Sequence, residues 1–186
     1  MVLASSSPQR KKLLTEMGYE FDVVSPDIDE TPRVGEVAPD LVVRLAKSKA
    51  AAVLKKLEGD VVVVGADSVV AVGSEILGKP KDVHEAREML NLLSGARHSV
   101  FTGYCLATKT ETVSGFDEAQ LWFHQISSEQ LDKYLDTGDW AGKAGACSLQ
   151  GESKGFVQRI EGEESTIVGL PTNLVSQALN DLGQLK

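Results

Sequence analysis

The sequence predicts an α/β protein built on a long, twisted mixed sheet with helices on both sides. Helical periods interleave with short apolar runs in the first half of the chain, which favours parallel strands joined by helices. Strand pairs joined by polar turns follow in the second half and bring in antiparallel pairing. The 186 residues, 42% apolar and 25% charged, suit one globular domain, with or without two lobes.

Five segments carry helix start and stop signals. The first begins with Ser7 as an N-cap and Pro8 at the first helical position, and it ends before Gly18. Two others begin at residue pairs with capping-box spacing. The expected helices are 8–17, 39–57, 82–95, 127–138 and 171–182, with the capping pairs Asp82/Glu85 and Ser127/Gln130.

Apolar runs predict the strands. Val61–Val64 is a continuous apolar run, which is typical of a strand buried on both faces. Gly73 and Ser74 predict a hairpin between two short runs, and a polar turn near 108–112 joins two longer ones. The expected strands are 61–64, 69–72, 75–77, 99–107, 113–124, 155–160 and 165–168.

Composition excludes several classes of protein. The formal net charge of −8 argues against a broad nucleic-acid-binding surface. No apolar run approaches the ~20 residues of a membrane span, and the start lacks a signal-peptide pattern. We therefore expect a cytoplasmic protein without a nucleic-acid or membrane partner. Cys105 and Cys147 lie far apart and outside any zinc-binding spacing, so we expect reduced, partly buried thiols.

The stretch LASSSPQR predicts a strand that ends in a serine-rich turn at a helix N-terminus. Backbone N–H groups and the hydroxyls of Ser5 and Ser7 would then point to one place, with Arg10 nearby, and such an arrangement suits phosphate. The same residues suit an ordinary capped helix start, so the pattern alone leaves both interpretations open.

Asp67 follows the buried run 61–64 in the sequence GADSVV. A carboxylate at the end of a buried strand lies where α/β sheets bind ligands, and it could hold a divalent metal or accept a proton from water. An Asx turn is the alternative. The predicted hairpin leads back from Asp67 to Lys79, which could bind phosphate as a point charge or be a surface lysine.

Two basic residues of the second expected helix border its apolar face. Lys49 and Arg44 either extend their charged ends to solvent or line a pocket. The acidic run 27–30, which contains Glu30, lies in an irregular segment after Pro26. Its oxygens suit Mg²⁺, although a solvated loop explains them equally.

The glycine-rich segment 138–151 is not expected to form regular structure. It could close over a ligand, and Gln150 could read a base edge because an amide both donates and accepts hydrogen bonds. A long connection is the alternative.

Together these segments resemble the Maf family of nucleoside triphosphate pyrophosphatases. The resemblance implies a single domain over residues 1–186, with two lobes, an elongated mixed sheet and a central cleft. It implies a hydrolase of acid anhydrides that cleaves a nucleoside triphosphate to the monophosphate and pyrophosphate with Mg²⁺ or Mn²⁺. The matching segments, in order, are LASSSPQRKKLL, DIDET, VVRLAKSKA, GADSVV, GKPKD, EAREMLNLLSGARHSVFTG, GKAGACSLQG and VGLP.

The resemblance also assigns roles to matching positions. Asp67 would be the general base or a metal ligand, and Glu30 would be a second carboxylate at the metal. The other matched positions would contact substrate: Lys49 and Lys79 neutralise charge, Ser5, Ser7 and Arg10 hold phosphate oxygens, and Ser68 and Gln150 lie near the base.

Substrate choice follows from the subtype. Gln150 and the run 143–145 look like the subtype that prefers dTTP and UTP, whereas Gln9 matches neither subtype and removes a positive charge at the substrate. We expect dTTP, UTP or modified pyrimidine triphosphates, and the family makes a homodimer an expectation. Two alternatives stay open at this point: a binding or regulatory protein in cell-division control, and another phosphate-ester hydrolase.

Overall fold

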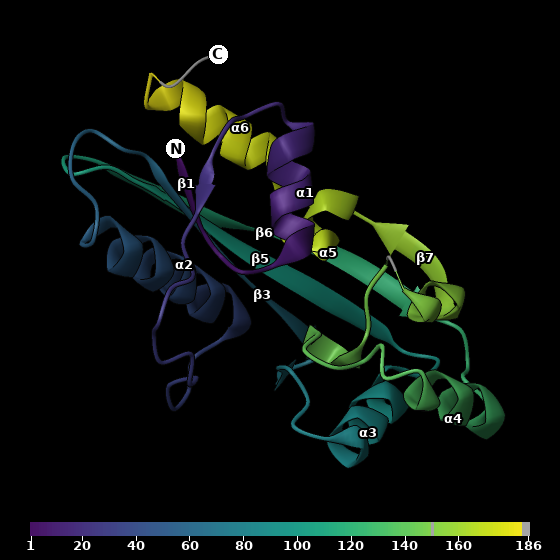
Figure 1. Ribbon diagram of the computed structural model, residues 1–186. Helices are drawn as coiled ribbons and strands as arrows, with labels where there is room; N and C mark the ends of the chain where they lie inside the picture. Colours follow the sequence, from purple (N-terminus) through teal and green to yellow (C-terminus); the bar gives the residue numbers. More distant parts are fainter. Residues whose placement is uncertain (150, 184–186) are drawn as a thin grey trace. The chain divides into compact units, whose positions relative to one another are not determined.

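The structure is a computed structural model that describes residues 1–149 and 151–183. Seven strands form a mixed sheet in the order β2-β1-β3-β5-β6-β7, with β4 paired to β3, and helices flank it (Figure 1). The α/β prediction is confirmed. The elements are β1 (Val2–Ala4), α1 (Pro8–Glu16), β2 (Asp22–Val23), α2 (Ala38–Leu54), β3 (Val63–Val72), β4 (Glu75–Leu77), α3 (Val83–Leu93), β5 (Arg97–Ala107), β6 (Thr112–Phe123), α4 (Ser128–Asp136), the short 3₁₀ helices η1 (Ala144–Ala146) and η2 (Glu152–Phe156), β7 (Val157–Glu161), α5 (Glu164–Val168) and α6 (Thr172–Asp181).

The chain divides into two compact units, each described by itself below. Unit 1 contains Met1–Asp67, Thr102–Asp117 and Gly169–Lys186, and unit 2 contains Ser68–Phe101 and Glu118–Val168. The first strands pair in parallel, β1 with β2 and β1 with β3, whereas β4 pairs antiparallel with β3 and β7 with β6.

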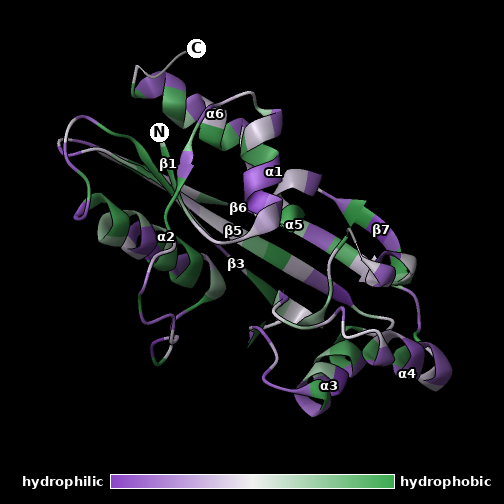
Figure 2. Cartoon of the chain, in the orientation of Figure 1, coloured by the Kyte–Doolittle hydropathy of each residue, from purple (hydrophilic) through white to green (hydrophobic). Residues whose placement is uncertain are grey.

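In unit 1 the sheet is covered on both faces. Strand residues alternate in direction, so the two faces belong to different clusters. The cluster that includes Leu3, Val64 and Leu106 packs with residues of α1 and α6, whereas the cluster that includes Val63 and Cys105 packs with α2. Along the helices hydrophobic and hydrophilic residues alternate, as expected of helices with one buried face (Figure 2).

Two glycines let α2 approach the strands closely. A Cβ atom on Gly65 would lie 2.3 Å from the carbonyl oxygen of Ala46, and one on Gly103 would lie 2.3 Å from that of Val42. Both oxygens belong to the α2 backbone, which cannot swing aside as a side chain could. A glycine inside a strand therefore marks close backbone contact here.

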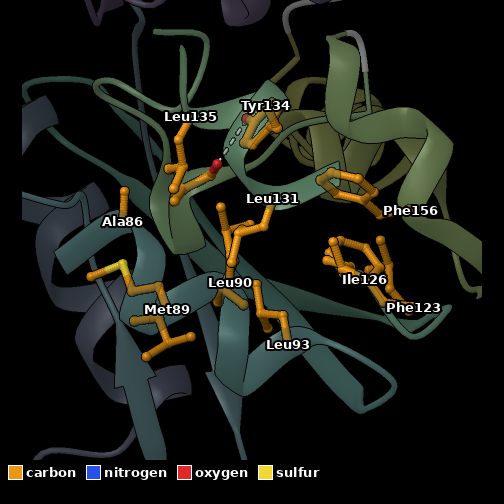
Figure 3. Close-up of a cluster of buried hydrophobic side chains, with 14 of the residues drawn as sticks. Ala86, Met89, Leu90, Leu93, Phe123, Ile126, Leu131, Tyr134, Leu135 and Phe156 are labelled. Carbon is orange, nitrogen blue, oxygen red and sulfur yellow. Dashed lines mark hydrogen bonds between the residues drawn. The ribbon is translucent and has the colours of Figure 1, made fainter. Parts of the chain in front are cut away.

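Unit 2 is held by a core of its own (Figure 3). Leu90 of α3, Leu131 of α4 and Phe123 of β6 belong to the same buried cluster. The Tyr134 hydroxyl donates a hydrogen bond of 2.8 Å to the carbonyl oxygen of Ala146, which ties η1 to α4. This bond fixes the middle of the glycine-rich segment against the core.

The helix caps follow the sequence signals. The Ser7 side chain accepts a hydrogen bond from the Arg10 N–H, and Ser127 forms a full capping box with Gln130. Asp82 caps α3, but Glu85 accepts from the Lys81 N–H instead of closing the box.

Three expectations are wrong. Residues 61–64 and 69–72 are not separate strands: β3 runs through Val63–Val72, because Gly65 leaves room for α2 and lets the strand continue. The expected strand 165–168 is the helix α5, where burial of Thr166 outweighs the strand propensity of its β-branched residues. The second helix ends at Leu54 and not at residue 57.

The two cysteines have no disulfide partner, as expected. Burial raises the pKa of Cys105 to about 11 and that of Cys147 to about 12, which makes both poor nucleophiles. Over residues 1–149 and 151–183, every helix is too short or too polar to cross a bilayer.

Candidate functional site

An ammonium group between two carboxylates forms the centre of the candidate site. The Lys49 Nζ lies 2.5 Å from the Asp67 Oδ1 and 2.8 Å from the Glu30 Oε1. The side chains of Lys49 and Asp67 are 5% and 9% exposed, whereas that of Glu30 is 44% exposed. Lys49 therefore points inward, and the group offers one buried and one accessible carboxylate.

The close contact between α2 and β3 creates this arrangement. Gly65 and Asp67 are two residues apart on β3, so their side-chain positions share one face of the strand. Gly65 lies against Ala46 and Ala50 of α2, and Lys49 belongs to the same turn of that helix. The carboxylates also stabilise the buried Lys49 ammonium, because an unpaired buried charge is strongly destabilising.

The serine-rich turn lies next to Asp67. In the parallel pairing of β1 and β3, Ala4 is the partner of Gly65, so the turn that follows β1 starts beside the residues that lead to Asp67. Ser5 is buried, and its Oγ accepts a hydrogen bond of 3.2 Å from the Ser7 N–H. The capped helix start is confirmed, and the anion site at the same turn stays a prediction.

Arg10 points back over this turn. Its Nη1 donates to the Ser5 Oγ at 3.4 Å, and its Nε donates to the carbonyl oxygen of Gly169 at 2.8 Å. Burial lowers the pKa of Arg10, while the charges of Asp67 and Glu30 act to raise it. The guanidinium is therefore in electrostatic contact with both carboxylates of the candidate site.

Unit 1 thus brings together five of the predicted residues: Ser5, Arg10, Lys49, Asp67 and Glu30. Asp67 is not at the end of a strand, as the sequence predicted, but inside β3. Ser7 caps α1, and Gln9 lies half-buried in its first turn.

The other predicted residues stay predictions. Ser68 and Lys79 belong to unit 2, where Ser68 is a half-buried residue of β3 and Lys79 is exposed between β4 and α3. Gln150 lies outside the described residues.

Sequence reasoning missed some residues that shape the site. Gly65 and Gly103 set the distance between α2 and the strands, and an isolated glycine in a strand pattern is the signal that could have found them. Arg44 was noticed, but its partner Glu36 was not. The two are joined across an irregular loop, where no periodicity predicts contact.

The two carboxylates fit a divalent cation. Among residues 1–149 and 151–183, no three His, Cys, Asp or Glu side chains gather as a ready-made metal cage. Mg²⁺ is commonly held by one or two carboxylates together with substrate phosphates, so an Asp–Glu pair matches its preference for oxygen ligands. Asp67 and Glu30 already share one cation, the Lys49 ammonium.

The chain is similar to known proteins over most of its length. The family of Maf-like proteins matches residues 1–182. The chain belongs to the Maf family. A dTTP/UTP pyrophosphatase from Hahella chejuensis is 43% identical over 92% of this chain and 86% of its own length. One from Alkaliphilus oremlandii is 44% identical over 92% of this chain and 90% of its own.

A solved structure matches a larger share of the chain, but at a lower sequence identity. It is a nucleoside-triphosphatase/dITP/XTP pyrophosphatase from Mycobacterium abscessus, matched over 100% of this Maf chain and 96% of its own. Its sequence identity is 18% and its TM-score 0.46.

Proposed function

We propose that the chain hydrolyses a nucleoside triphosphate, dTTP, UTP or a modified pyrimidine relative, to the monophosphate and pyrophosphate. The observation that carries the proposal is the buried Lys49 between Asp67 and Glu30 beside the serine-rich turn. The two relatives at 43% and 44% identity, both named dTTP/UTP pyrophosphatase, support the same reaction.

In the proposed reaction the Asp67 carboxylate accepts a proton from the water that attacks the α-phosphorus. A new bond forms between the water oxygen and that phosphorus, and the bond from phosphorus to the bridging oxygen breaks. Pyrophosphate leaves with the bonding electron pair. Lys49, 2.5 Å from Asp67, fixes the carboxylate and adds positive charge where the phosphates gather.

The charge of the triphosphate requires several donors. Arg10, the Ser5 hydroxyl and the N-terminus of α1 supply them in unit 1, and Lys79 is proposed to add a further cation. Asp67 and Glu30 would hold Mg²⁺ or Mn²⁺, which when bound neutralises phosphate charge. Positioning and charge stabilisation are the main parts of phosphoryl-transfer catalysis, and these groups are of the types that supply them.

The remaining assignments belong to the same proposal. Gln9, Ser68 and Gln150 are proposed to act on substrate choice, because a hydroxyl and two amides can hydrogen-bond a base or sugar. A homodimer stays an expectation from the family resemblance, and a cytoplasmic location without nucleic-acid or membrane partners stays a prediction of the sequence.

The experiment is product analysis of the purified protein with Mg²⁺ and a panel of canonical and modified nucleoside triphosphates. Wild type is compared with Asp67→Asn and with Asp132→Asn, a matched change at an exposed aspartate of α4. We expect pyrophosphate and monophosphate from wild type and Asp132→Asn, fastest with pyrimidines, and a loss of turnover in Asp67→Asn.

Each other result has a definite meaning. Fastest turnover of a purine triphosphate would contradict the pyrimidine preference. Release of orthophosphate would indicate a different phosphate-ester hydrolase. Absence of turnover with every nucleotide would refute the enzyme and favour the regulatory interpretation.

A further inference from the structure

The loop that carries Glu30 is fastened to α2 by an arginine. The Arg44 Nε lies 2.6 Å from one carboxylate oxygen of Glu36, and its Nη2 lies 2.7 Å from the other. The same Nη2 donates to the carbonyl oxygen of Thr31 at 3.1 Å. One guanidinium thus binds both ends of residues 31–36, starting at the residue that follows Glu30.

The loop also closes on itself around Glu36. The Arg33 N–H donates to the Glu36 carboxylate at 2.9 Å, and the Glu36 N–H donates to the carbonyl oxygen of Arg33 at 3.0 Å. Gly35 completes this turn with a φ of +75°, a conformation that glycine adopts readily. On the other side of Glu30, the Thr31 N–H donates to the Asp29 side chain at 2.9 Å.

These bonds matter because Glu30 has no regular structure to hold it. It lies in the irregular stretch between β2 and α2, with a side chain 44% exposed. α2 contacts this stretch at two points, through Arg44 and, five residues or about 7.5 Å further along the helix axis, through Lys49. Contact at two points fixes both the position and the direction of the loop.

We propose that Arg44, with Glu36, is a positioning residue that sets where the Glu30 carboxylate stands beside Lys49 and Asp67. The proposal rests on the proposed function, in which Glu30 works on the metal and the substrate phosphates. Arg44 itself acts through the loop. A misplacement of about 1 Å in a site of this kind can cost on the order of 100-fold in rate.

The pair of Arg44 and Glu36 is suited to hold the loop over a wide range of pH. The hydrogen bonds from Arg44 lower the pKa of Glu36 to about 2, and the bond to Glu36 raises the pKa of Arg44. Both groups therefore stay charged far into acid. A planar guanidinium can bind a carboxylate with two parallel bonds and reach a carbonyl as well, whereas a lysine ammonium acts as a point charge.

The decisive test is a double-mutant cycle between Arg44→Met and Glu30→Gln, with kcat and KM measured for dTTP and UTP. If Arg44 acts through Glu30, Arg44→Met alone lowers kcat/KM about 10-fold to 100-fold, but lowers it less than about 3-fold when Glu30 is already Gln. Arg44→Lys is expected to recover only part of the loss, because lysine keeps the positive charge but lacks the planar guanidinium that binds both carboxylate oxygens.

The matched control is Arg87→Met, which removes an arginine that pairs with a carboxylate at 2.6 Å on the surface of unit 2. We expect its kcat/KM to stay within about 2-fold of wild type. Hydrogen exchange adds a readout that does not depend on activity. The amides of residues 29–36 should exchange about 10-fold faster in Arg44→Met and in Glu36→Gln, and at the wild-type rate in Arg87→Met.

The outcomes are separable. Wild type without pyrophosphate release would overturn the proposed function, and the positioning role with it. If wild type is active but Arg44→Met lowers kcat/KM by the same factor in the Glu30→Gln background as alone, only the positioning role is overturned. Unchanged kcat/KM and unchanged exchange in Arg44→Met would overturn it as well.

Discussion

Gly65→Ala tests the packing that creates the site. The added Cβ atom would meet the Ala46 carbonyl oxygen at 2.3 Å and the Ala50 nitrogen at 2.9 Å, both in the α2 backbone. Ordinary contact begins at 3.4 Å, so the first of these atoms must move away by 1.1 Å, the difference between the two distances. Overpacking of this kind typically destabilises a protein by about 1–3 kcal/mol.

The same displacement reaches the ion group. Lys49 lies in the turn of α2 that must move, and its Nζ is 2.5 Å from Asp67 on the strand that stays. We therefore expect Gly65→Ala to lower kcat by up to about 100-fold, since the rate is sensitive to shifts near 1 Å. The loss of stability should lower the melting temperature by roughly 2–4 °C per kcal/mol for a chain of this size.

The assay combines urea unfolding with steady-state kinetics. Gly155→Ala is the matched control, because a Cβ atom there meets nothing within 4 Å and the φ is not in the left-handed region. It should leave stability within about 0.5 kcal/mol and activity unchanged. A Gly65→Ala protein as stable and as active as the control would refute the reasoning that close packing of α2 sets the site.

Three further predictions concern single groups. Burial lowers the pKa of His98 from 6.5 to about 4, so the unfolded chain binds the proton first as pH falls. The free energy of unfolding should therefore decline by about 3 kcal/mol from pH 6.5 to 4. His98→Gln should remove this decline when unfolding by urea is followed at each pH. Tyr134→Phe leaves the Ala146 carbonyl without its 2.8 Å partner and should cost about 1–3 kcal/mol in urea unfolding. Lys49→Met leaves Asp67 buried without its cation, and should cost about 3–5 kcal/mol and abolish turnover.

Each of these has a result that contradicts it. A wild-type pH dependence shared by His98→Gln would mean that other groups cause the decline. Full stability of Tyr134→Phe would mean that water replaces the hydroxyl at Ala146. Retention of wild-type turnover by Lys49→Met would remove the ion group from the mechanism.

Local signals in the sequence predicted the parts of the fold that depend on neighbours in the chain. Ser127 with Gln130 forms the predicted capping box, and the hairpin at Gly73 and Ser74 joins β3 to β4. These features are set by hydrogen bonds within a few residues, so the sequence displays them directly.

Features that depend on distant contacts were predicted poorly. The continuation of β3 through Gly65 requires the helix that packs on it, and the helical state of α5 depends on the burial of Thr166. The candidate site also combines features that the sequence indicated with contacts that it did not. The resemblance indicated Asp67, Glu30 and Lys49, whose contact the structure shows, but the bond from Arg44 to Glu36 crosses an irregular loop without any repeating pattern.

The ion group has a consequence for how a cation and a nucleotide affect each other's binding. Lys49 and Arg10 carry two positive charges, and Asp67 and Glu30 carry two negative ones, so the four side chains are neutral as a set. A divalent cation alone or a polyphosphate alone would disturb this neutrality, and buried pairs are poorly screened by salt. Cation and nucleotide together bring charges of opposite sign, which partly cancel. Each is therefore expected to bind more tightly when the other is present, because the charges of these four side chains couple the two binding events.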